Sequence, residues 1–438
     1  MTASVDRSAT AGPTSTASAR ATIGHVGWST VGTLGARFGG AAAGVVAAHL
    51  LGPAGRGQYA VLVAVATVLA AIATGGLQFW VVRQVADPAS TAPVRAVIAR
   101  HVTVVVTLGV VGAVAAAPAL VALDLATAPE VLAAGGLVTA TATSLIVLGI
   151  LNGRRQMRRI ALATSAGAGG YLGLLATLGA LDVAGPATVT AAAAAGQLCI
   201  AALCLAVYHR LPRPEVSDVR LAHRAGVRFG WPAALGEIMV MASLRADIVL
   251  VAALLGREDA GHYAVALALA ELMWVIPDGA AQVVLPMAAS GEPPRATSRL
   301  IGLALLAQLV AGVALVVAAP FAVDLLFGDA FEPAARPMLL LVIASFGLGT
   351  WKLLAADVVG RGDARARGAS TVVGLVLMVA ADLVLIPRLG LRGAALGAGI
   401  GYWAAAAVVA LAWRAARREA AGPPVAATVP LPPTVPPS

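Results

Sequence analysis

One twelve-residue motif occurs twice in the chain, 204 residues apart, and each copy joins two long apolar segments. Residues 50–61 read LLGPAGRGQYAV and residues 254–265 read LLGREDAGHYAV, so seven of the twelve positions are identical. The register continues beyond the motif, since Gly75 matches Gly279 at the same spacing. This pattern predicts a duplication of one membrane half, with the functional site between the two halves.

The rest of the chain is as apolar as this interpretation requires. Hydrophobic residues make up 59% of it and charged residues 12%, whereas soluble domains have about 45–50% and about 25%. A helix needs about 20 mostly apolar residues to cross a bilayer, and continuous rather than alternating apolar runs predict helices rather than barrel strands. The fold class predicted is an all-α integral membrane protein with twelve transmembrane helices. The predicted spans are 26–50, 58–82, 97–122, 131–152, 160–181, 187–208, 229–255, 262–288, 297–326, 337–359, 368–388 and 393–414.

The basic residues predict the orientation. Of the thirty Lys and Arg residues, twenty-two lie at the termini or in loops after even-numbered spans, five in loops after odd-numbered spans, and three inside spans. This bias follows the positive-inside rule and predicts a multi-pass protein of the bacterial cytoplasmic (inner) membrane with both termini cytoplasmic. The net charge of +9 is therefore a topology signal, and no nucleic-acid partner is expected.

Polar segments divide the chain into the predicted domains. The longest internal one is rich in arginine and follows the sixth span, so it separates two lobes of six spans each. The Ser/Thr-rich start and the Pro-rich end are typical of disordered tails. The predicted domains are a disordered cytoplasmic N-terminal tail (1–24), an N-terminal six-helix lobe (25–209), a basic cytoplasmic linker (210–228), a C-terminal six-helix lobe (229–415) and a disordered Pro-rich cytoplasmic tail (416–438).

The sequence has no arrangement of residues typical of an enzyme, a cofactor site or a metal site. It lacks a Gly-x-x-x-x-Gly-Lys phosphate-binding loop and a metal-ligand cluster among its six histidines. Cys199 and Cys204 lie within one apolar span, so they are interpreted as packing residues. We therefore expect neither an enzyme nor a cofactor-dependent protein.

Several short motifs, in this order and spacing, resemble one transporter family. They are Leu50–Tyr59, Gly230–Pro232, Asp247 with Gly256–Tyr263, Phe327–Phe331, Gly360–Gly362 and Ile386–Leu396. Together they resemble the polysaccharide (O-antigen type) flippases of the multidrug/oligosaccharidyl-lipid/polysaccharide (MOP) exporter superfamily. The resemblance implies two six-helix lobes in a V that opens alternately to either side. It also implies that the substrate is a polyprenyl-diphosphate-linked oligosaccharide, a membrane lipid that is flipped from the inner to the outer leaflet. Such a substrate serves cell-surface polysaccharide or lipopolysaccharide biosynthesis. Polysaccharide polymerases and glycosyltransferases are the partners that such a flippase would have.

Two related classes are the alternatives. Lipid-linked peptidoglycan precursor flippases have fourteen spans as a rule, which the count of twelve does not support. Multidrug and toxin extrusion (MATE) antiporters share the twelve-span plan, and a drug or metabolite antiporter of that architecture remains the second hypothesis. They typically place a functional acidic residue in the first lobe, where this sequence has none within a span.

The cations inside the spans are the candidate substrate ligands. A charge at the bilayer centre costs at least about 2.5–3.5 kcal/mol, so intramembrane charges usually face protein or water. Arg37 and Arg245 both lie near the predicted midplane, one in each lobe, and an arginine fork matches phosphate oxygens. We hypothesise that they bind the diphosphate, assisted by Lys352. The competing interpretation pairs Arg245 with Glu237 or Asp247, and Arg37 with an acid across the lobes. On an ideal helix only Glu237 would lie on a face near Arg245.

The acids inside the spans all lie in the second lobe, and they are candidates for ion coupling or lobe closure. Glu271 and Asp278 are seven residues apart, hence on one helix face with Trp274 between them. They could bind a proton or sodium ion that drives transport, or pair with Arg245 or Lys352 to close the lobe. The full set of candidate acids is Glu237, Asp247, Glu271, Asp278, Asp357 and Asp382.

Overall fold

The computed structural model describes residues 14–122, 126–209, 211 and 218–421, and within these it is built of helices with no strand. The first half contains α1 (Thr14–Thr74), α2 (Leu77–Ala86), α3 (Val94–Ala122), α4 (Ala128–Gly153), α5 (Met157–Ala180) and α6 (Pro186–Tyr208). The second half contains α7 (Val219–Ser243), α8 (Ala246–Leu255), α9 (Arg257–Ala270), η1 (Glu271–Trp274), α10 (Val275–Ala289), α11 (Pro294–Phe327), η2 (Asp329–Ala334), α12 (Ala335–Gly360), α13 (Ala364–Leu389) and α14 (Leu391–Ala421).

The number of membrane passes agrees with the sequence prediction. Eleven helical segments of the described residues are long and apolar enough to cross a membrane. One of them, Phe38–Thr74, contains the sharp bend at Gly52, so α1 holds two passes and the total becomes the predicted twelve. The protein is therefore a multi-pass, all-helical membrane protein.

The two copies of the repeated motif form equivalent turns. Gly52 has φ 63° and ψ 179°, and Gly256 has φ 102° and ψ 178°. A positive φ is readily accessible only to glycine, which explains why both copies keep this residue. In each copy the chain reverses at the glycine and the next helix starts at once, with Pro53 or Arg257. We call the end of the bundle that holds these two turns the turn end, and the end where α1 begins and α14 finishes the terminal end.

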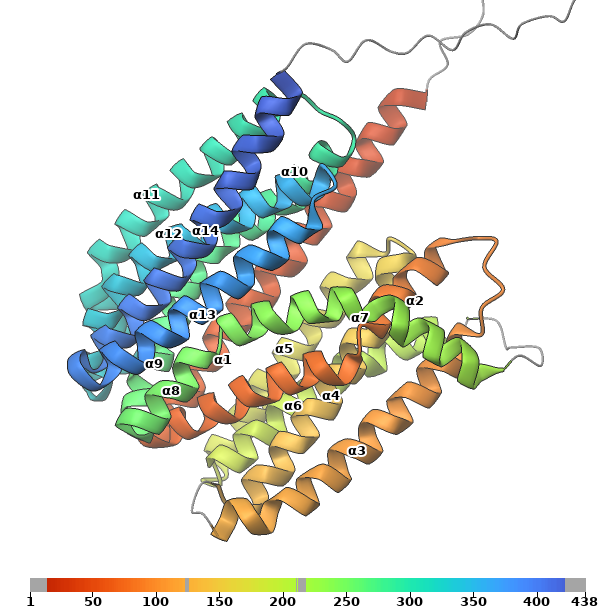
Figure 1. Cartoon of the computed structure of the whole chain (residues 1–438). Helices are drawn as coiled ribbons and strands as arrows, with labels where there is room; N and C mark the ends of the chain where they lie inside the picture. The colour runs from red at the N-terminus through yellow and green to blue at the C-terminus, as the bar shows by residue number, and fades with distance from the viewer. Residues whose placement is uncertain (1–13, 123–125, 210, 212–217, 422–438) are drawn as a thin grey trace, which may run out of the picture.

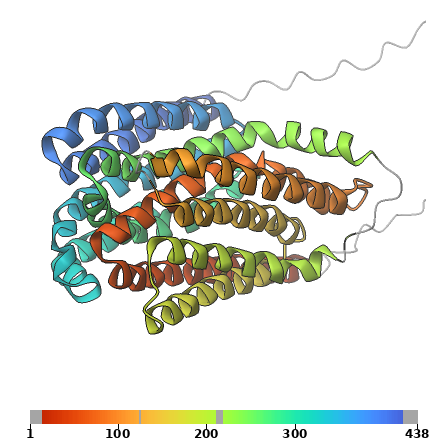
Figure 2. The same ribbon diagram turned by 90° about the horizontal axis from the view of Figure 1, so that it is seen from below.

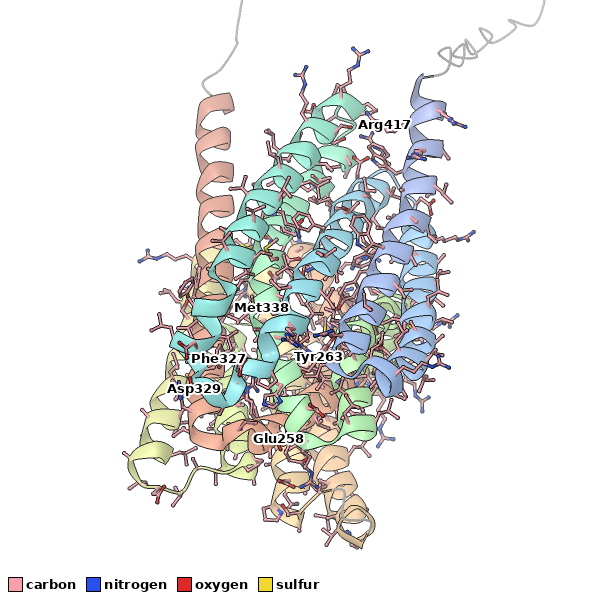
Figure 3. The ribbon with its side chains drawn as sticks, turned by 90° about the vertical axis from the view of Figure 1, so that its left-hand side faces the viewer. Glu258, Tyr263, Phe327, Asp329, Met338 and Arg417 are labelled. Carbon is pink, nitrogen blue, oxygen red and sulfur yellow. The ribbon has the colours of Figure 1, made fainter. Side chains whose placement is uncertain are left out.

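The helices form two bundles that diverge from the turn end. In Figure 1 the bundle of α9–α14 and the bundle of α2–α6 lie close together near α8 and α9 and separate towards the other end. The sticks of Figure 3 place Glu258 and Asp329 at the turn end and Arg417 at the terminal end. The predicted V of two lobes is thus the observed arrangement.

Helix α7 connects the lobes because it packs on both. It contacts α1, α2 and α3 on one side and α13 on the other, and it runs alongside α2 in both Figure 1 and Figure 2. Where α2 and α7 cross, Gly76 and Gly230 approach so closely that a methyl group on either would overlap the other's carbonyl oxygen. This contact joins the two predicted lobes along one flank.

Several helix boundaries differ from the prediction. Helix α1 begins at Thr14, inside the predicted tail of residues 1–24, and α14 continues to Ala421, beyond the predicted lobe boundary at 415. Helix α7 begins at Val219, so the arginines of residues 219–228 lie on a helix rather than in the linker. The remainder of the predicted tails, residues 1–13 and 422–438, lies outside the described residues. Hydropathy missed these helical turns because they are polar or arginine-rich.

Three passes are interrupted inside the bundle, and hydropathy did not predict any of the three interruptions. The second pass breaks at Gly75–Gly76, the seventh at Leu244–Arg245, and the eighth changes to a 3₁₀ turn over Glu271–Trp274. Discontinuous helices in membrane transporters commonly mark binding sites, because their free backbone groups and flanking side chains face a cavity.

Candidate functional site

A cavity of ≈ 850 Å³ lies between the lobes and reaches the terminal end. Asn152 and Met157, at the turn between α4 and α5, line it from the first lobe. Arg367, near the start of α13, lines it from the second. The wall between is mostly from α7, η1, α10 and α12. The cavity therefore occupies the space where the two lobes diverge.

Two ion pairs stand in the wall of this cavity. Arg245 Nη1 donates to Glu271 Oε1 at 2.7 Å, and Lys352 Nζ donates to Asp278 Oδ1 at 2.6 Å. Lys352 Nζ also lies 5.0 Å from the ring centre of Trp274, within cation–π range. Both pairs join different passes, so the acids of the eighth pass bind the cations of the seventh and tenth. Glu271 and Asp278 thus pair with Arg245 and Lys352, which is the pairing considered as one of two alternatives for these acids.

Arg245 is placed by the interruption of its helix. Helix α7 ends at Ser243 and α8 starts at Ala246, so Arg245 is the N-cap residue of α8. The interruption turns its side chain towards Glu271, which is itself the first residue of the 3₁₀ turn in the eighth pass. The pair thus connects two helix breaks, and a charged pair at two breaks is the kind of element that can rearrange when the helices move.

The sequence-based geometry for Glu237 was wrong because it assumed an unbroken helix. Glu237 lines the cavity, but among the described residues it forms no ion pair with Arg245. The break at Leu244–Arg245 lies between them, so the angle expected on an ideal helix does not apply. Glu237 remains an acid of the cavity wall without an assigned role.

The described lining of the cavity is balanced in charge. Arg245, Lys352 and Arg367 are basic. Glu237, Glu271 and Asp278 are acidic. The first-lobe candidate, Arg37, is in α1, and its side chain lies outside the described residues. The strongly cationic midplane suggested by the sequence is therefore not evident in the described wall.

Asp247 and Asp382 lie inside the second lobe rather than in the cavity wall. Both are 0% exposed. Asp247 Oδ2 accepts a hydrogen bond from Tyr263 Oη at 2.7 Å, and Oδ1 accepts one from the Ile248 amide at 2.8 Å. Neither oxygen of Asp382 has a hydrogen-bond partner within the described part of the chain. A buried carboxyl group without partners is costly and calls for a proton or a cation.

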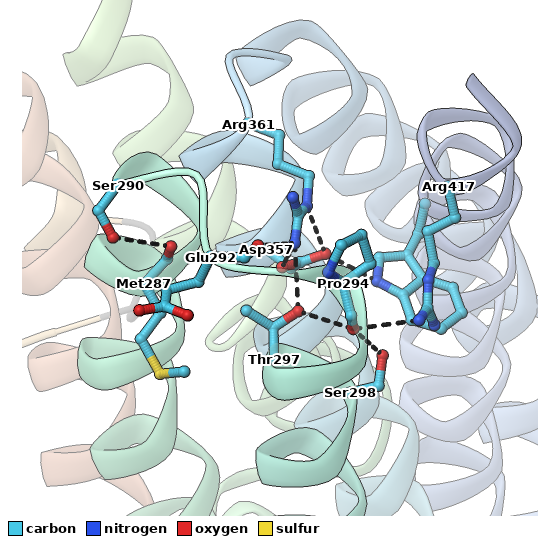
Figure 4. Close-up of polar contacts among 10 residues, drawn as sticks. Met287, Ser290, Glu292, Pro294, Thr297, Ser298, Asp357, Arg361 and Arg417 are labelled. Carbon is cyan, nitrogen blue, oxygen red and sulfur yellow. Dashed lines mark hydrogen bonds and ion pairs between the residues drawn. The ribbon is translucent and has the colours of Figure 1, made fainter. Parts of the chain in front are cut away.

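Asp357 forms a polar clamp at the terminal end, away from the lining of the cavity (Figure 4). Its oxygens accept from Arg361 Nε and Nη2, each at 3.2 Å, and from Trp413 Nε1 at 2.9 Å. Arg417 Nη2 donates to the carbonyl oxygen of Pro294 at 3.0 Å, so the clamp joins α11, α12 and α14. These contacts are those of a structural cluster.

One charged residue of the interface between the lobes was missed. The sequence placed Arg56 in a loop, but the helix resumes at Pro53, and Arg56 is only 8% exposed. It lines a second hollow of ≈ 360 Å³ together with Arg245 and Glu271. The proline after Gly52, which is favourable in the first turn of a helix, was the available signal that Arg56 is helical.

A protein-family model described as "Polysaccharide biosynthesis protein" matches residues 25–292. The chain belongs to this family. The match spans more than half of this polysaccharide biosynthesis protein and confirms the resemblance found in its motifs. No curated protein sequence is significantly similar to it.

Solved structures show the fold of this polysaccharide biosynthesis protein. An inward-facing multidrug resistance MATE family transporter of the MOP superfamily is similar with a TM-score of 0.72 and 19% identity, over 88% of this chain and 96% of that one. An outward-facing MATE transporter gives 0.63 and 18%, over 90% and 94%. The lipid II flippase MurJ, in an inward closed conformation, gives 0.70 and 10%, over 88% and 87%. The protein therefore has the MOP fold.

Proposed function

We propose that the protein is a flippase that moves a polyprenyl-diphosphate-linked oligosaccharide across the bacterial cytoplasmic membrane for cell-surface polysaccharide biosynthesis. The observation that supports this most directly is the ≈ 850 Å³ cavity between the lobes, with Arg245 and Lys352 in its wall, in a chain of the polysaccharide biosynthesis family. In this proposal the terminal end is cytoplasmic, in agreement with the bias of basic residues.

The ion pairs of the wall supply the proposed diphosphate ligands. Arg245 Nε is buried and has no hydrogen-bond partner in the described part of the chain, while Nη1 is bound to Glu271. A phosphate oxygen would satisfy Nε and form a charge-assisted hydrogen bond, which is stronger than a neutral one. Lys352, held by Asp278, offers a second positive charge on the same wall. Glu271 and Asp278 then keep these cations in position until the anion enters.

Alternating access follows from the shape of the two lobes. The carrier's diphosphate and first sugars would enter the cavity from the cytoplasmic leaflet while the polyprenyl chain stays in lipid. Closure at the terminal end and opening at the turn end would expose the head group to the opposite leaflet. A motion of two rigid bundles about a common interface is an established class of transition.

The unpartnered carboxyl of Asp382 is the proposed coupling site. It is fully buried in the second lobe, close enough to the hydrogen-bonded Asp247 for the two carboxyl groups to interact electrostatically. Binding and release of a proton or sodium ion at Asp382 would change the charge of the second lobe during each cycle, and a buried charge without a partner is strongly unfavourable.

The second candidate function is export of a cationic drug or metabolite. The cavity wall has as many acidic as basic residues, and Glu237 has no ion-pair partner among the described residues. An unpaired acid in the wall favours a cationic substrate. MATE structures also share the fold. Export of cations would use Glu237, Glu271 and Asp278 as ligands instead of Arg245 and Lys352.

Binding measurements on the purified protein separate the two candidates. We expect a short-chain polyprenyl diphosphate to raise the apparent unfolding temperature in detergent, whereas the matching polyprenyl alcohol and a lipophilic cation leave it unchanged. The effect should disappear in Arg245→Gln and persist in Arg392→Gln, which removes an exposed arginine. Stabilisation by the cation alone, lost in Glu237→Gln, would support the antiporter instead.

A further inference from the structure

The second hollow lies on the opposite side of the Arg245–Glu271 pair from the main cavity. Both hollows are lined by Arg245 and Glu271, so this pair stands between them. The smaller one, which we call the outer chamber, has a volume of ≈ 360 Å³ and is enclosed by both passes of α1 and by α5, α8 and α9. It lies nearer the turn end, since its wall includes Arg56, four residues after the turn at Gly52.

Arg56 is a buried cation without a counter-ion among the described residues. It is 8% exposed, and within the described part of the chain it makes no ion pair and its Nε has no hydrogen-bond partner. Its guanidinium lies 5.3 Å from the ring centre of Tyr59, a cation–π contact that leaves its in-plane N–H groups available. Because an unpaired buried charge is unfavourable, we expect the guanidinium of Arg56 to bind an anion.

Two tyrosines of the same chamber add a hydrogen-bond donor. The hydroxyl groups of Tyr59 and Tyr171 are 2.7 Å apart, and one donates to the other. The hydroxyl that accepts keeps its own hydrogen, which can then be donated to a third group. Both tyrosines line the outer chamber, so a phenol O–H and a guanidinium fork face one small space.

The charge of the outer chamber differs from that of the main cavity. Its lining has two cations, Arg56 and Arg245, against the single acid Glu271. The main cavity has three of each. The outer chamber is therefore the hollow with an excess of positive charge, and its smaller volume admits a phosphate group more readily than a sugar chain.

We propose that the outer chamber is a second phosphate-binding station, in which Arg56 and the Tyr59–Tyr171 pair receive the carrier's diphosphate from Arg245. The inference rests on the proposed flippase function and extends it by assigning an order. Arg245, which lines both hollows, binds the diphosphate first, and Arg56 binds it as the turn end opens. Arg56 is thus a ligand of the transport step rather than of initial binding.

The test compares Arg56→Gln with Arg56→Lys and with the matched control Arg257→Gln. Arg257 follows the equivalent turn in the second copy of the repeat, and its side chain is exposed. Each variant is reconstituted in sealed liposomes with a polyprenyl-diphosphate-linked disaccharide, and the rate of its translocation is measured by cleavage with a glycosidase that cannot cross the membrane. Binding of a short-chain polyprenyl diphosphate is measured separately in detergent.

Loss of a charged hydrogen-bond donor changes a rate by at least about tenfold. We expect Arg56→Gln to lower the maximal translocation rate by that factor while diphosphate binding in detergent stays within about twofold. Arg56→Lys should recover part of the rate because it keeps the charge, and Arg257→Gln should match the wild type. Removing an uncompensated buried charge should also leave the ligand-free unfolding temperature unchanged or higher, whereas loss of a purely structural arginine would lower it.

The outcomes separate the two proposals. A wild-type translocation rate in Arg56→Gln would overturn the second station and leave the flippase function intact. An equal loss in Arg56→Gln and Arg56→Lys, together with a lower unfolding temperature in both, would overturn it as well, because Arg56 would then be structural. Absence of translocation and diphosphate binding in the wild-type protein would instead contradict the proposed function itself.

Discussion

The two ends of the interface between the lobes differ in their contacts: one has close backbone packing and the other has charged side chains. At the turn end the first and second copies of the repeat pack backbone against backbone. A methyl group on Gly57 would overlap the carbonyl oxygen of Arg257, and one on Gly261 would overlap that of Pro53. At the terminal end the lobes diverge around a cavity with two ion pairs in its wall. The repeat therefore forms a seal that needs no side chains, and the departures from the repeat furnish the charges of the site.

The close backbone contact explains why both copies of the motif have a glycine at this position, Gly57 in the first and Gly261 in the second. Glycines allow helices to approach closely in a membrane, where van der Waals packing rather than the hydrophobic effect holds helices together. A seal of this kind is tight in one conformation and places no polar group in lipid in the other. The seal and the charged cavity are then complementary parts of one alternating-access device.

The largest effect is expected from blocking the seal. Gly57→Ala or Gly261→Ala introduces a methyl group into a backbone contact of the closed state alone. Overpacking costs about 1–3 kcal/mol or more, so the ratio of turn-end-closed to turn-end-open molecules should fall by about fivefold to a hundredfold. Spin labels on the exposed residues Asp182 and Glu332 should report a longer distance across the turn end, and transport should fall in parallel.

Gly185→Ala is the matched control for this prediction. Gly185 precedes α6 at the same end of the bundle, and a methyl group there would meet no atom within 4 Å. The variant should behave as wild type. If Gly57→Ala left the distance distribution unaltered, the glycine contact would not be the seal.

The next effect concerns the charged end. Arg245→Gln removes the cation that borders both hollows, and Lys352→Gln removes the one held by Asp278. Loss of a charge-assisted hydrogen bond costs about 1.5–3 kcal/mol, so each should weaken polyprenyl diphosphate binding by about tenfold to a hundredfold. Isothermal titration in detergent measures this directly. If both variants bound polyprenyl diphosphate as tightly as the wild type, Arg245 and Lys352 would not be its ligands and the two ion pairs would be structural.

A third prediction concerns coupling in the second lobe. Asp382→Asn keeps the size of the side chain but cannot ionise, so transport should persist without stimulation by an imposed proton or sodium gradient. The measurement is the ratio of transport rates with and without the gradient, and Asp324→Asn, at an exposed site, is the control. Unchanged stimulation in Asp382→Asn would exclude this carboxyl group as the coupling site.

The smallest effect on transport is expected at the polar clamp of the terminal end. Asp357→Ala leaves the Trp413 N–H and the Arg361 guanidinium without their acceptor. An unsatisfied buried donor costs about 1–3 kcal/mol, so the apparent unfolding temperature should fall, while transport at a permissive temperature stays near wild type. A selective loss of transport with normal stability would show that the clamp belongs to the site.

The architecture was predictable because hydropathy and glycine chemistry are local properties. Twelve passes, the two-lobe arrangement and the turns at Gly52 and Gly256 all follow from apolar length and from the repeat. The helix interruptions at Gly75–Gly76, Leu244–Arg245 and Glu271–Trp274 were not predicted, although the glycine pair Gly75–Gly76 was a local signal for the first of them. Interruptions depend on tertiary contacts with neighbouring helices, which one sequence does not display.

The site was predictable only in part for the same reason. The sequence identified Arg245, Glu271, Lys352 and Asp278 as intramembrane charges and considered their pairing, and the structure brings them together. The competing interpretation favoured Glu237 as a partner of Arg245 on an ideal helix, but that helix is interrupted at Leu244–Arg245. The predicted spans left Arg56 in a loop, although the helix restarts at Pro53. The division of the interface into a main cavity and an outer chamber depends on packing between lobes and has no counterpart in the sequence.

Translocation by the purified wild-type protein is the direct test of the proposed flippase function. Sealed liposomes containing the protein and a fluorescent polyprenyl-diphosphate-linked disaccharide are treated with a membrane-impermeant glycosidase, and the protected fraction is followed with time. We expect that the protected half of the lipid becomes accessible in the presence of the protein and stays protected in protein-free liposomes and in Gly57→Ala. Protection that persists with the wild-type protein, while a lipophilic cation is transported, would contradict the flippase and identify a drug or metabolite antiporter.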